Sequence, residues 1–470
     1  MGTKFSLEFL IVMTAFLALT ACGGGGGTQV AGGGIGGTGV SYGTVTDFGS
    51  VILNDSHLDD STASITLDDN PGAGPHGGLK KGMVVKVTGT FSGNTGTAET
   101  IAFRDNLEGP VCDKQTADGI TTLRVLGQVV IVDATTVVEN SAAINLGDIV
   151  EVSGLADSQE RIHASFIENK TAGAISPVIE VKGRVDSVNG LTGITINALE
   201  VDTSTATIDN SIPGGQPAVG QFVEVKGSAS GFTCGAVTDT LVATSIELEA
   251  EGAGAIAAGV RAEVEGFVTE VNAGGFKIGN QQIATNGGTL FLPDDFSAAD
   301  IVVGAKVEAE GTIANGVLSA TKISFRENVK LESDVASGNS SSFTLAGLPG
   351  ITINTDGNTD FKSGVSVVPG AHVRVRGREG PNNTVLATRI ESQSGSTVFL
   401  QGAVDTVANP DITVLGITVN TGAVSQFKDV DDNLISSTAF FELLQPGTLV
   451  KIKGDLQAGV AIWGETELED

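Results

Sequence analysis

Histidine is the side chain best suited to acid–base and metal chemistry near neutral pH, and this sequence has four of them: His57, His76, His163 and His372. None stands at a zinc-type spacing from another histidine or from a cysteine. No Gly-x-Ser-x-Gly elbow occurs, and no histidine lies beside a plausible serine or cysteine nucleophile. The sequence therefore predicts a protein that is not an enzyme and that carries no cofactor.

One acidic run has the oxygen spacing of a calcium loop. Asp356, Asn358 and Asp360 place three side-chain oxygen ligands two residues apart. The glycine at the sixth loop position and the bidentate glutamate at the twelfth are both absent. Asp, Asn and Gly between strands commonly form turns, so a turn is the simpler interpretation and a calcium site is the alternative.

The N-terminal segment has the pattern of an export signal. An apolar run from Phe9 to Leu19 is about half as long as the roughly 20 residues that a membrane-spanning helix needs. The residues Leu19-Thr20-Ala21-Cys22 resemble the lipobox of bacterial lipoproteins. That resemblance implies cleavage of a signal peptide, residues 1–21, and a lipid on Cys22. The alternative is an ordinary signal peptide with a chance cysteine.

The segment after Cys22 predicts how the chain is placed in the cell envelope. Residues 22–39 are rich in glycine and are expected to form a flexible tether between the lipid and the folded part. Gly23 stands where an aspartate would favour inner-membrane retention, so the lipoprotein resemblance favours the outer membrane. The lipid on Cys22 would be the membrane partner of this chain.

Two further cysteines, Cys112 and Cys234, are left for other chemistry. An oxidising periplasm permits them to pair, and the predicted modules that contain them are neighbours. A disulfide between them and two free thiols are both open at this point.

The composition excludes several classes of partner. The net charge is −29, although charged residues make up only 17% of the chain. Such a chain repels phosphate backbones, so we expect no nucleic-acid partner. With one Trp and one Tyr, it also lacks the aromatic side chains on which sugars stack. A protein, a peptide or a small apolar ligand remains possible.

A motif, Gly-x-x-Val-x-Val-x-Gly, recurs along the chain. Its six copies begin at Gly82, Gly147, Gly220, Gly304, Gly370 and Gly447. A second element, Ala-x-x-Ile, follows five of them, at Ala98, Ala164, Ala243, Ala320 and Ala387, and is degenerate after the sixth. Apolar and polar residues alternate within the motif, as in a strand with one buried face, and the glycines mark turns. We expect the alanine where one strand crosses close to another backbone.

The repeats predict an all-β fold, a tandem array of six modules, each a small five-stranded β-barrel. The expected modules are residues 40–106, 107–172, 173–250, 251–328, 329–396 and 397–470. Helical character is expected only in short stretches, near Ser297 to Ile301 and Ser436 to Leu444.

With these motifs in register, residues 40 to 468 resemble a bacterial family, the domain of unknown function DUF5666. The segment from Val125 to Asp133 is especially similar to the second-repeat type of that family. The resemblance implies an OB-like barrel for each repeat and implies no activity. The function that we predict is therefore a non-enzymatic, lipid-anchored cell-envelope scaffold or protein-interaction protein. The alternative is a periplasmic or surface module that binds a ligand or a metal such as calcium, and an envelope enzyme with an unrecognised site is a third reading.

Overall fold

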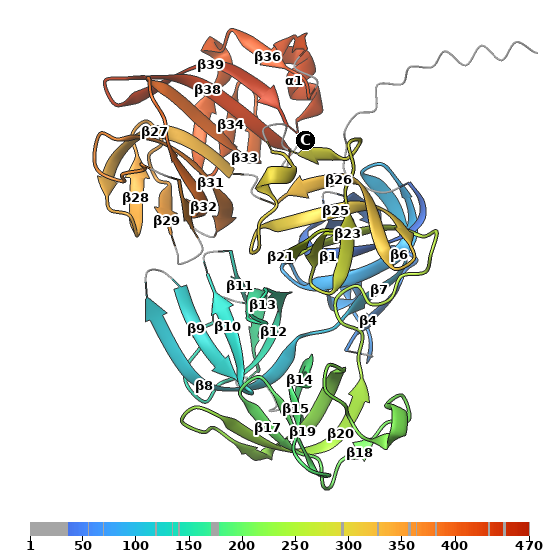
Figure 1. Ribbon diagram of the computed structural model, residues 1–470. Coiled ribbons are helices and arrows are strands. Elements are labelled where there is room, and N and C mark those ends of the chain that lie inside the picture. Colours follow the sequence, from blue (N-terminus) through green and yellow to red (C-terminus); the bar gives the residue numbers. More distant parts are fainter. Residues whose placement is uncertain are drawn as a thin grey trace, which may run out of the picture. The chain divides into compact units, whose positions relative to one another are not determined.

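The computed structural model describes residues 36–469, except 55, 69, 118–119, 134, 140–141, 171–177, 293–295, 327–328, 356–358, 363, 381–382, 431–432 and 445–447. These residues form an all-β protein with short helical turns, which Figure 1 shows coloured from the N-terminus in blue to the C-terminus in red. Both predicted helical stretches are present, as η5 (Ala298–Asp300) and α1 (Ser437–Leu443). Within the described part, no helix has the length and apolar character needed to cross a membrane.

The strands fall into six sets, which we call modules 1 to 6. Module 1 contains β1 (Gly37–Phe48), β2 (Val51–Leu53), β3 (Ser56–Asp59), β4 (Ser64–Leu67), β5 (Asn70–Pro71), η1 (Pro75–Gly78), β6 (Val84–Ser92) and β7 (Thr95–Phe103). Module 2 contains β8 (Leu107–Ala117), β9 (Ile120–Val125), β10 (Gln128–Val132), β11 (Val137–Val138), β12 (Ile149–Ala156) and β13 (Ile162–Asn169). Module 3 contains β14 (Val178–Arg184), β15 (Ser187–Val188), β16 (Gly193–Ile196), β17 (Leu199–Asp202), β18 (Thr207–Ile208), η4 (Pro213–Gly215), β19 (Phe222–Thr233) and β20 (Asp239–Leu248).

The second half of the chain repeats this arrangement. Module 4 contains β21 (Arg261–Asn272), β22 (Gly275–Ile278), β23 (Gln281–Ala284), β24 (Leu290–Leu292), η5, β25 (Lys306–Ala314) and β26 (Val317–Phe325). Module 5 contains β27 (Val329–Gly338), β28 (Ser342–Leu345), β29 (Thr352–Asn354), β30 (Asp360–Phe361), β31 (His372–Gly380) and β32 (Thr384–Ser392). Module 6 contains β33 (Thr397–Ala408), β34 (Asp411–Val414), β35 (Ile417–Asn420), η7 (Thr421–Ala423), β36 (Gln426–Lys428), β37 (Leu434–Ile435), α1, β38 (Leu449–Gln457) and β39 (Val460–Leu468).

Module 4 shows the strand order that the modules share. Its opening strand β21 pairs antiparallel with both β22 and β25. β22 continues into β23, β25 pairs with β26, and β23 runs parallel to β26, which closes the barrel. The same parallel closure recurs in modules 1, 2, 3 and 5, while in module 6 it is β36 that runs parallel to the last strand. The predicted small five-stranded barrels are therefore confirmed.

The repeated motif forms the second-to-last strand of each module, such as β6 in module 1. The last glycine of the motif has a specific steric role. At Gly89 the register of β6 and β7 shifts, and Gly89 faces Ala98. A Cβ atom on Gly89 would lie 2.2 Å from the carbonyl oxygen of Thr97. Equivalent shifts occur at Gly154, Gly227, Gly311 and Gly377, which face the alanines of the second element. The bulge therefore requires a glycine opposite a small residue.

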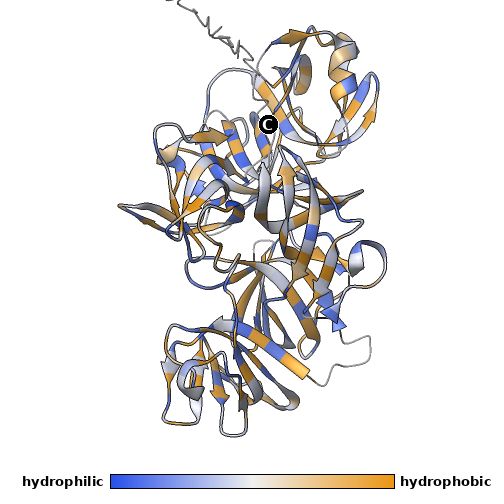
Figure 2. Ribbon diagram, turned by 90° about the vertical axis from the view of Figure 1, so that its right-hand side faces the viewer, coloured by the Kyte–Doolittle hydropathy of each residue, from blue (hydrophilic) through white to orange (hydrophobic). Residues whose placement is uncertain are grey.

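In module 6 the structure shows why the second element, Ala-x-x-Ile, is degenerate. Gly454 lies at the same register shift, but it faces Trp463 in place of an alanine. Elsewhere the alternation of the motif strands is the expected one, with Val85 and Val87 buried and Lys86 half-buried between them. Figure 2 shows hydrophobic and hydrophilic residues alternating along many of the strands.

The modules are joined in pairs by their opening strands, and we call each such pairing a joint. β8 pairs antiparallel with β14 at joint 2–3, and β27 pairs antiparallel with β33 at joint 5–6. At joint 1–4, β1 runs parallel to β21, so module 1 pairs with a module that is far away in the sequence. Each joint merges two barrels into one 13-stranded sheet. A buried apolar core spans both modules at joint 2–3 and at joint 5–6.

Candidate functional site

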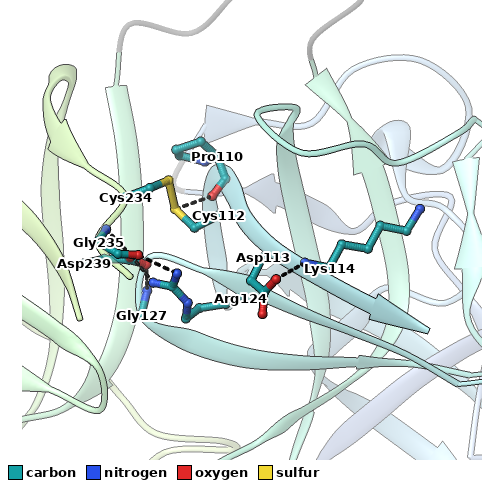
Figure 3. The surroundings of a disulfide bond; sticks show 9 residues. All are labelled: Pro110, Cys112, Asp113, Lys114, Arg124, Gly127, Cys234, Gly235 and Asp239. Carbon is teal, nitrogen blue, oxygen red and sulfur yellow. Dashed lines mark hydrogen bonds and ion pairs between the residues drawn. A yellow bond between two sulfur atoms is a disulfide. The ribbon is translucent and has the colours of Figure 1, made fainter. Parts of the chain in front are cut away.

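The two cysteines that the sequence left open are joined by a disulfide across joint 2–3 (Figure 3). Cys112 lies on β8 of module 2, and Cys234 follows directly after β19 of module 3. Their Cα atoms are 5.4 Å apart, and 122 positions separate them in the sequence. The same pair of modules thus shares a covalent bond and a continuous sheet.

An ion pair beside the disulfide holds the same two modules together. Asp239, the first residue of β20, is fully buried and accepts hydrogen bonds from the amide nitrogens of Gly127 (2.8 Å) and Gly235 (3.1 Å). Arg124 of β9 forms an ion pair with Asp239 and donates to the carbonyl of Gly235 at 2.8 Å (Figure 3). Module 2 supplies Arg124 and Gly127, and module 3 supplies Asp239. No pattern in the sequence predicts this contact, because Arg124 and Asp239 are 115 positions apart.

A buried lysine on β14, one of the two strands of joint 2–3, is surrounded by acids from modules 1 and 3. The Lys182 side chain is only 6% exposed, and its Nζ lies 3.1 Å from Glu180 Oε1 and 3.1 Å from Glu224 Oε1. It also binds Asp105, and it lies 3.8 Å from Asp68. Both aspartates belong to module 1, whereas Glu180 and Glu224 belong to module 3 with Lys182, so two modules meet at this amine.

Burial and the surrounding charges shift the pKa values of Lys182 and Asp105. Burial alone would lower the pKa of Lys182, but the carboxylates around it hold this pKa well above its ordinary value. Burial raises the pKa of Asp105 well above its usual range, and the neighbouring carboxylates add to the rise. Oxygens of Asp68, Asp105 and Glu180 lie within 4.8 Å of one another, a spacing that a metal ion could bridge. The Lys182 amine already provides the positive charge there.

Joint 1–4 has a different polar centre, with two neighbouring acids. Glu263 of β21 is 0% exposed and Glu308 of β25 is 1% exposed. Ser41 of β1 donates to Glu263 Oε2 at 2.7 Å, and Arg326 forms an ion pair with Glu308. Burial, followed by repulsion from Glu308, raises the pKa of Glu263 well above its usual range. Glu263 therefore retains its proton at a pH at which an exposed glutamate has lost it.

The other predicted site residues lie largely outside the described part of the chain. This holds for Cys22, Asp356 and Asn358. Asp360, the third residue of the calcium-type run, is on β30, and its carboxylate lies 2.6 Å from Lys362 Nζ and 3.6 Å from Arg389 Nε. Calcium at this run stays a prediction.

Three of the four histidines contact carboxylates. His76 Nδ1 lies 2.8 Å from Asp60, His163 Nε2 lies 3.1 Å from Asp157, and His372 Nδ1 lies 2.7 Å from Asp334. These partners could not be expected from the sequence, because the two members of each pair stand at unrelated spacings along the chain.

Comparison with known proteins identifies the repeat. The model of the domain of unknown function (DUF5666) matches residues 108–168, 182–247, 265–324, 333–391 and 401–462, which is more than half of the chain. Module 1 precedes these matches and has the same strand order. No curated protein matches the sequence significantly.

One solved structure, drosophila Unr CSD456, aligns with 45% of this chain and 97% of its own, at 13% identity and a TM-score of 0.15. A likeness this weak carries no argument about fold or function. The family match rests on five repeats in register, each of which coincides with strands that close a barrel. The chain therefore belongs to the DUF5666 family of domains of unknown function.

Proposed function

We propose that this chain is a non-enzymatic scaffold of the cell envelope, anchored by a lipid on Cys22, whose barrel modules hold protein partners at fixed positions. The observation that carries the proposal is the pairing of modules through their opening strands. A scaffold needs modules of fixed relative orientation, and backbone pairing across a joint restricts orientation more than a flexible linker does.

The buried charges support the same function. Lys182, Asp239 and Glu263 are almost completely buried, and all three lie at joints between modules. Lys182 and Asp239 form hydrogen bonds with groups of another module, and buried polar groups that have such partners favour one arrangement over its competitors. The apolar residues that remain most exposed, such as Leu191 and Leu434, lie in turns or short edge strands, where a partner protein could reach them. The net charge of −29 favours a protein or peptide partner over nucleic acid.

Fixed geometry is the property that tests the scaffold. Spin labels that do not use cysteine can be placed at exposed Val129 of module 2 and exposed Leu191 of module 3. The control pair, Leu191 and Val219, lies within module 3. We expect pulsed electron paramagnetic resonance to give distance distributions of similar width for the two pairs. A much broader distribution across joint 2–3 than within module 3 would refute a scaffold of fixed geometry.

The membrane anchor and the partners need a separate experiment in cells. A photo-crosslinking residue at Leu191 of the full chain should capture a defined envelope protein, and the same residue at buried Val225 should not. The Cys22→Ala variant should leave the membrane fraction and lose this cross-link, because a lipid anchor supplies the membrane residence. Unchanged membrane association of that variant would contradict the lipid anchor. Equal capture from Leu191 and Val225 would contradict a specific partner surface.

The alternative function, a ligand-binding envelope module, is favoured by one observation, a cavity between modules 2, 4 and 5. This alternative does not require the scaffold to be wrong, since a ligand that contacts several modules would also hold them together.

A further inference from the structure

A cavity of about 330 Å³ lies where modules 2, 4 and 5 meet. Its volume is at the lower end of the range for small-molecule sites, roughly 300–1,000 Å³. Module 2 contributes Arg161 and His163, module 4 contributes Phe267 and Phe296, and module 5 contributes Arg378 and Arg389. Three arginines around one cavity, with His163 beside them, are unusual in a chain that has 26 Lys and Arg residues against 55 Asp and Glu residues.

Most of these basic groups are already paired with acids that also line the cavity. Asp157 lies 2.6 Å from Arg161 and 3.1 Å from His163. Burial raises the pKa of Asp157, but its hydrogen bonds from His163 and Arg161 outweigh burial and lower this pKa to about 2. Asp300 lies 2.9 Å from Arg389. Hydrogen bonds from Arg389 and Ser297 likewise lower the pKa of Asp300 against the effect of burial, so both acids are ionised at neutral pH and neutralise the charges of Arg161 and Arg389.

Arg378 is the exception among the basic residues of the cavity. Its side chain is 14% exposed, and its described ion pair, with Asp133 Oδ2, is long at 3.7 Å. The Nε atom of Arg378 is buried without a hydrogen-bond partner in the described part of the chain. A guanidinium group has five N–H donors, and leaving buried donors unsatisfied is costly. An anion in the cavity would supply the acceptors that Arg378 lacks.

One part of the wall beside Arg378 is aromatic and apolar. The guanidinium carbon of Arg378 is 5.6 Å from the ring centre of Phe267, and the rings of Phe296 and Phe325 stack at 4.2 Å. All three phenylalanines are buried and line the cavity. Val302 and Val303 add apolar surface that is half exposed. Such walls favour a ligand whose body is flat and apolar.

We propose that this cavity binds a small organic anion, a carboxylate with an aromatic or other apolar body. The carboxylate pairs with the guanidinium of Arg378 through two parallel N–H···O hydrogen bonds, and the apolar body lies against Phe267 and Phe296. Because three modules line the cavity, the bound ligand stabilises their assembly through linkage. This inference goes beyond the scaffold function and does not depend on the lipid anchor.

Calorimetric titration of the full chain, purified in detergent, tests the proposal with benzoate and phenylacetate as probes. We expect at least one of them to bind with a dissociation constant of roughly 1 mM or below, as is typical of a small fragment. Benzyl alcohol, which has the ring without the charge, should bind about tenfold more weakly or not at all. If neither carboxylate binds at up to about 10 mM, the proposal is wrong.

Variants assign the binding to Arg378. Arg378→Gln should weaken binding of the carboxylate by about tenfold or more, because the charged donors are removed. Arg378→Lys keeps the charge but loses the planar pair of donors, so it should weaken binding less than the glutamine variant. If the glutamine variant does not fold, the lysine variant tests the role of Arg378. The matched control is Arg104→Gln, which breaks an ion pair with Glu249; neither residue lines the cavity, so binding should be unchanged. Binding that is equal in wild type and both Arg378 variants would overturn the assignment.

Discussion

Cys112 and Cys234 are 122 positions apart in the sequence, and their Cα atoms are 5.4 Å apart in the structure. The bond between them connects an opening strand of one barrel to the last hairpin of the next. The same two barrels also share the β8–β14 pairing, so reduction of the disulfide leaves a second connection in place.

The first prediction concerns this disulfide. Replacement of both Cys112 and Cys234 by alanine should lower the free energy of unfolding by about 2–5 kcal/mol, because the unfolded chain regains the entropy of a large loop. Denaturant unfolding with and without reductant measures the change. Reductant should lower the midpoint of the wild type and leave the double variant unaffected. Equal midpoints for the oxidised wild type and the double variant would show that the bond contributes nothing.

The second prediction concerns Lys182. Lys182→Met leaves Asp105 and Glu224 buried without their cation, and loss of one partner of a buried ion pair costs roughly 3–5 kcal/mol. The loss should be larger at pH 7 than at pH 4, where part of the acid cluster is protonated. Equilibrium unfolding at both values checks this. The control Lys81→Met removes an exposed lysine and should change stability by less than about 0.5 kcal/mol. A similar effect of both substitutions would mean that Lys182 is not a structural cation.

The third prediction follows from the raised pKa of Glu263. Since the folded protein holds this proton more tightly than the unfolded chain, stability falls as the pH rises above the ordinary glutamate value. Glu263→Gln keeps a neutral group and removes the repulsion with Glu308. It should therefore unfold with a smaller loss of stability between pH 5 and pH 8 than the wild type, by more than about 0.5 kcal/mol. Glu99→Gln, at an exposed position on β7, should retain the wild-type pH dependence. Parallel pH profiles for the wild type and Glu263→Gln would refute a proton held at joint 1–4.

The fourth prediction concerns Gly127, in the turn between β9 and β10. Its φ is +73°, and a Cβ there would lie 2.4 Å from backbone atoms of Ala198 and Leu199 in module 3. Gly127→Ala should lose roughly 2 kcal/mol or more, from left-handed strain and from separation of the two modules. Gly459→Ala is the matched control, because Gly459 has φ +79° and nothing within 4 Å of a Cβ. It should cost only the strain, about 1 kcal/mol. Equal melting curves for the two variants would exclude a tight contact at Gly127.

The barrels could be predicted because their requirements are local. The glycine at the end of the motif and the alanine of the second element are steric consequences of one bulge, seen for example between Gly311 and Ala320. These constraints recur in every copy except the last, where Trp463 replaces the alanine. Alternating burial, glycine turns and small residues at crossings are properties of single strands, so a sequence displays them directly.

The joints could not be predicted from the sequence, because the pairing of one barrel with another depends on tertiary structure and not on a pattern within a single strand. Lys182 stands in an alternating strand, where a polar residue is ordinarily expected on the wet face, yet module 1 covers it. Arg124 and Asp239 are 115 residues apart, and no pattern connects them. The only signal was the charge carried by the opening strands, such as Glu263 and Glu265 of β21, which are buried at a joint.

The parallel pairing of β1 with β21 has a consequence for the order of folding. Val40 of β1 faces Ala262 of β21, so module 1 cannot complete its sheet until module 4 has been synthesised. Until then β1 is an unprotected edge strand, which is a template for intermolecular pairing. Modules 2 and 3 lie in the chain segment between the two paired strands. The entropic cost of bringing β1 and β21 together is smallest once modules 2 and 3 have folded, because the flexible part of that segment is then shorter. The nascent chain therefore passes through an aggregation-prone interval, during which a holding chaperone would be most needed.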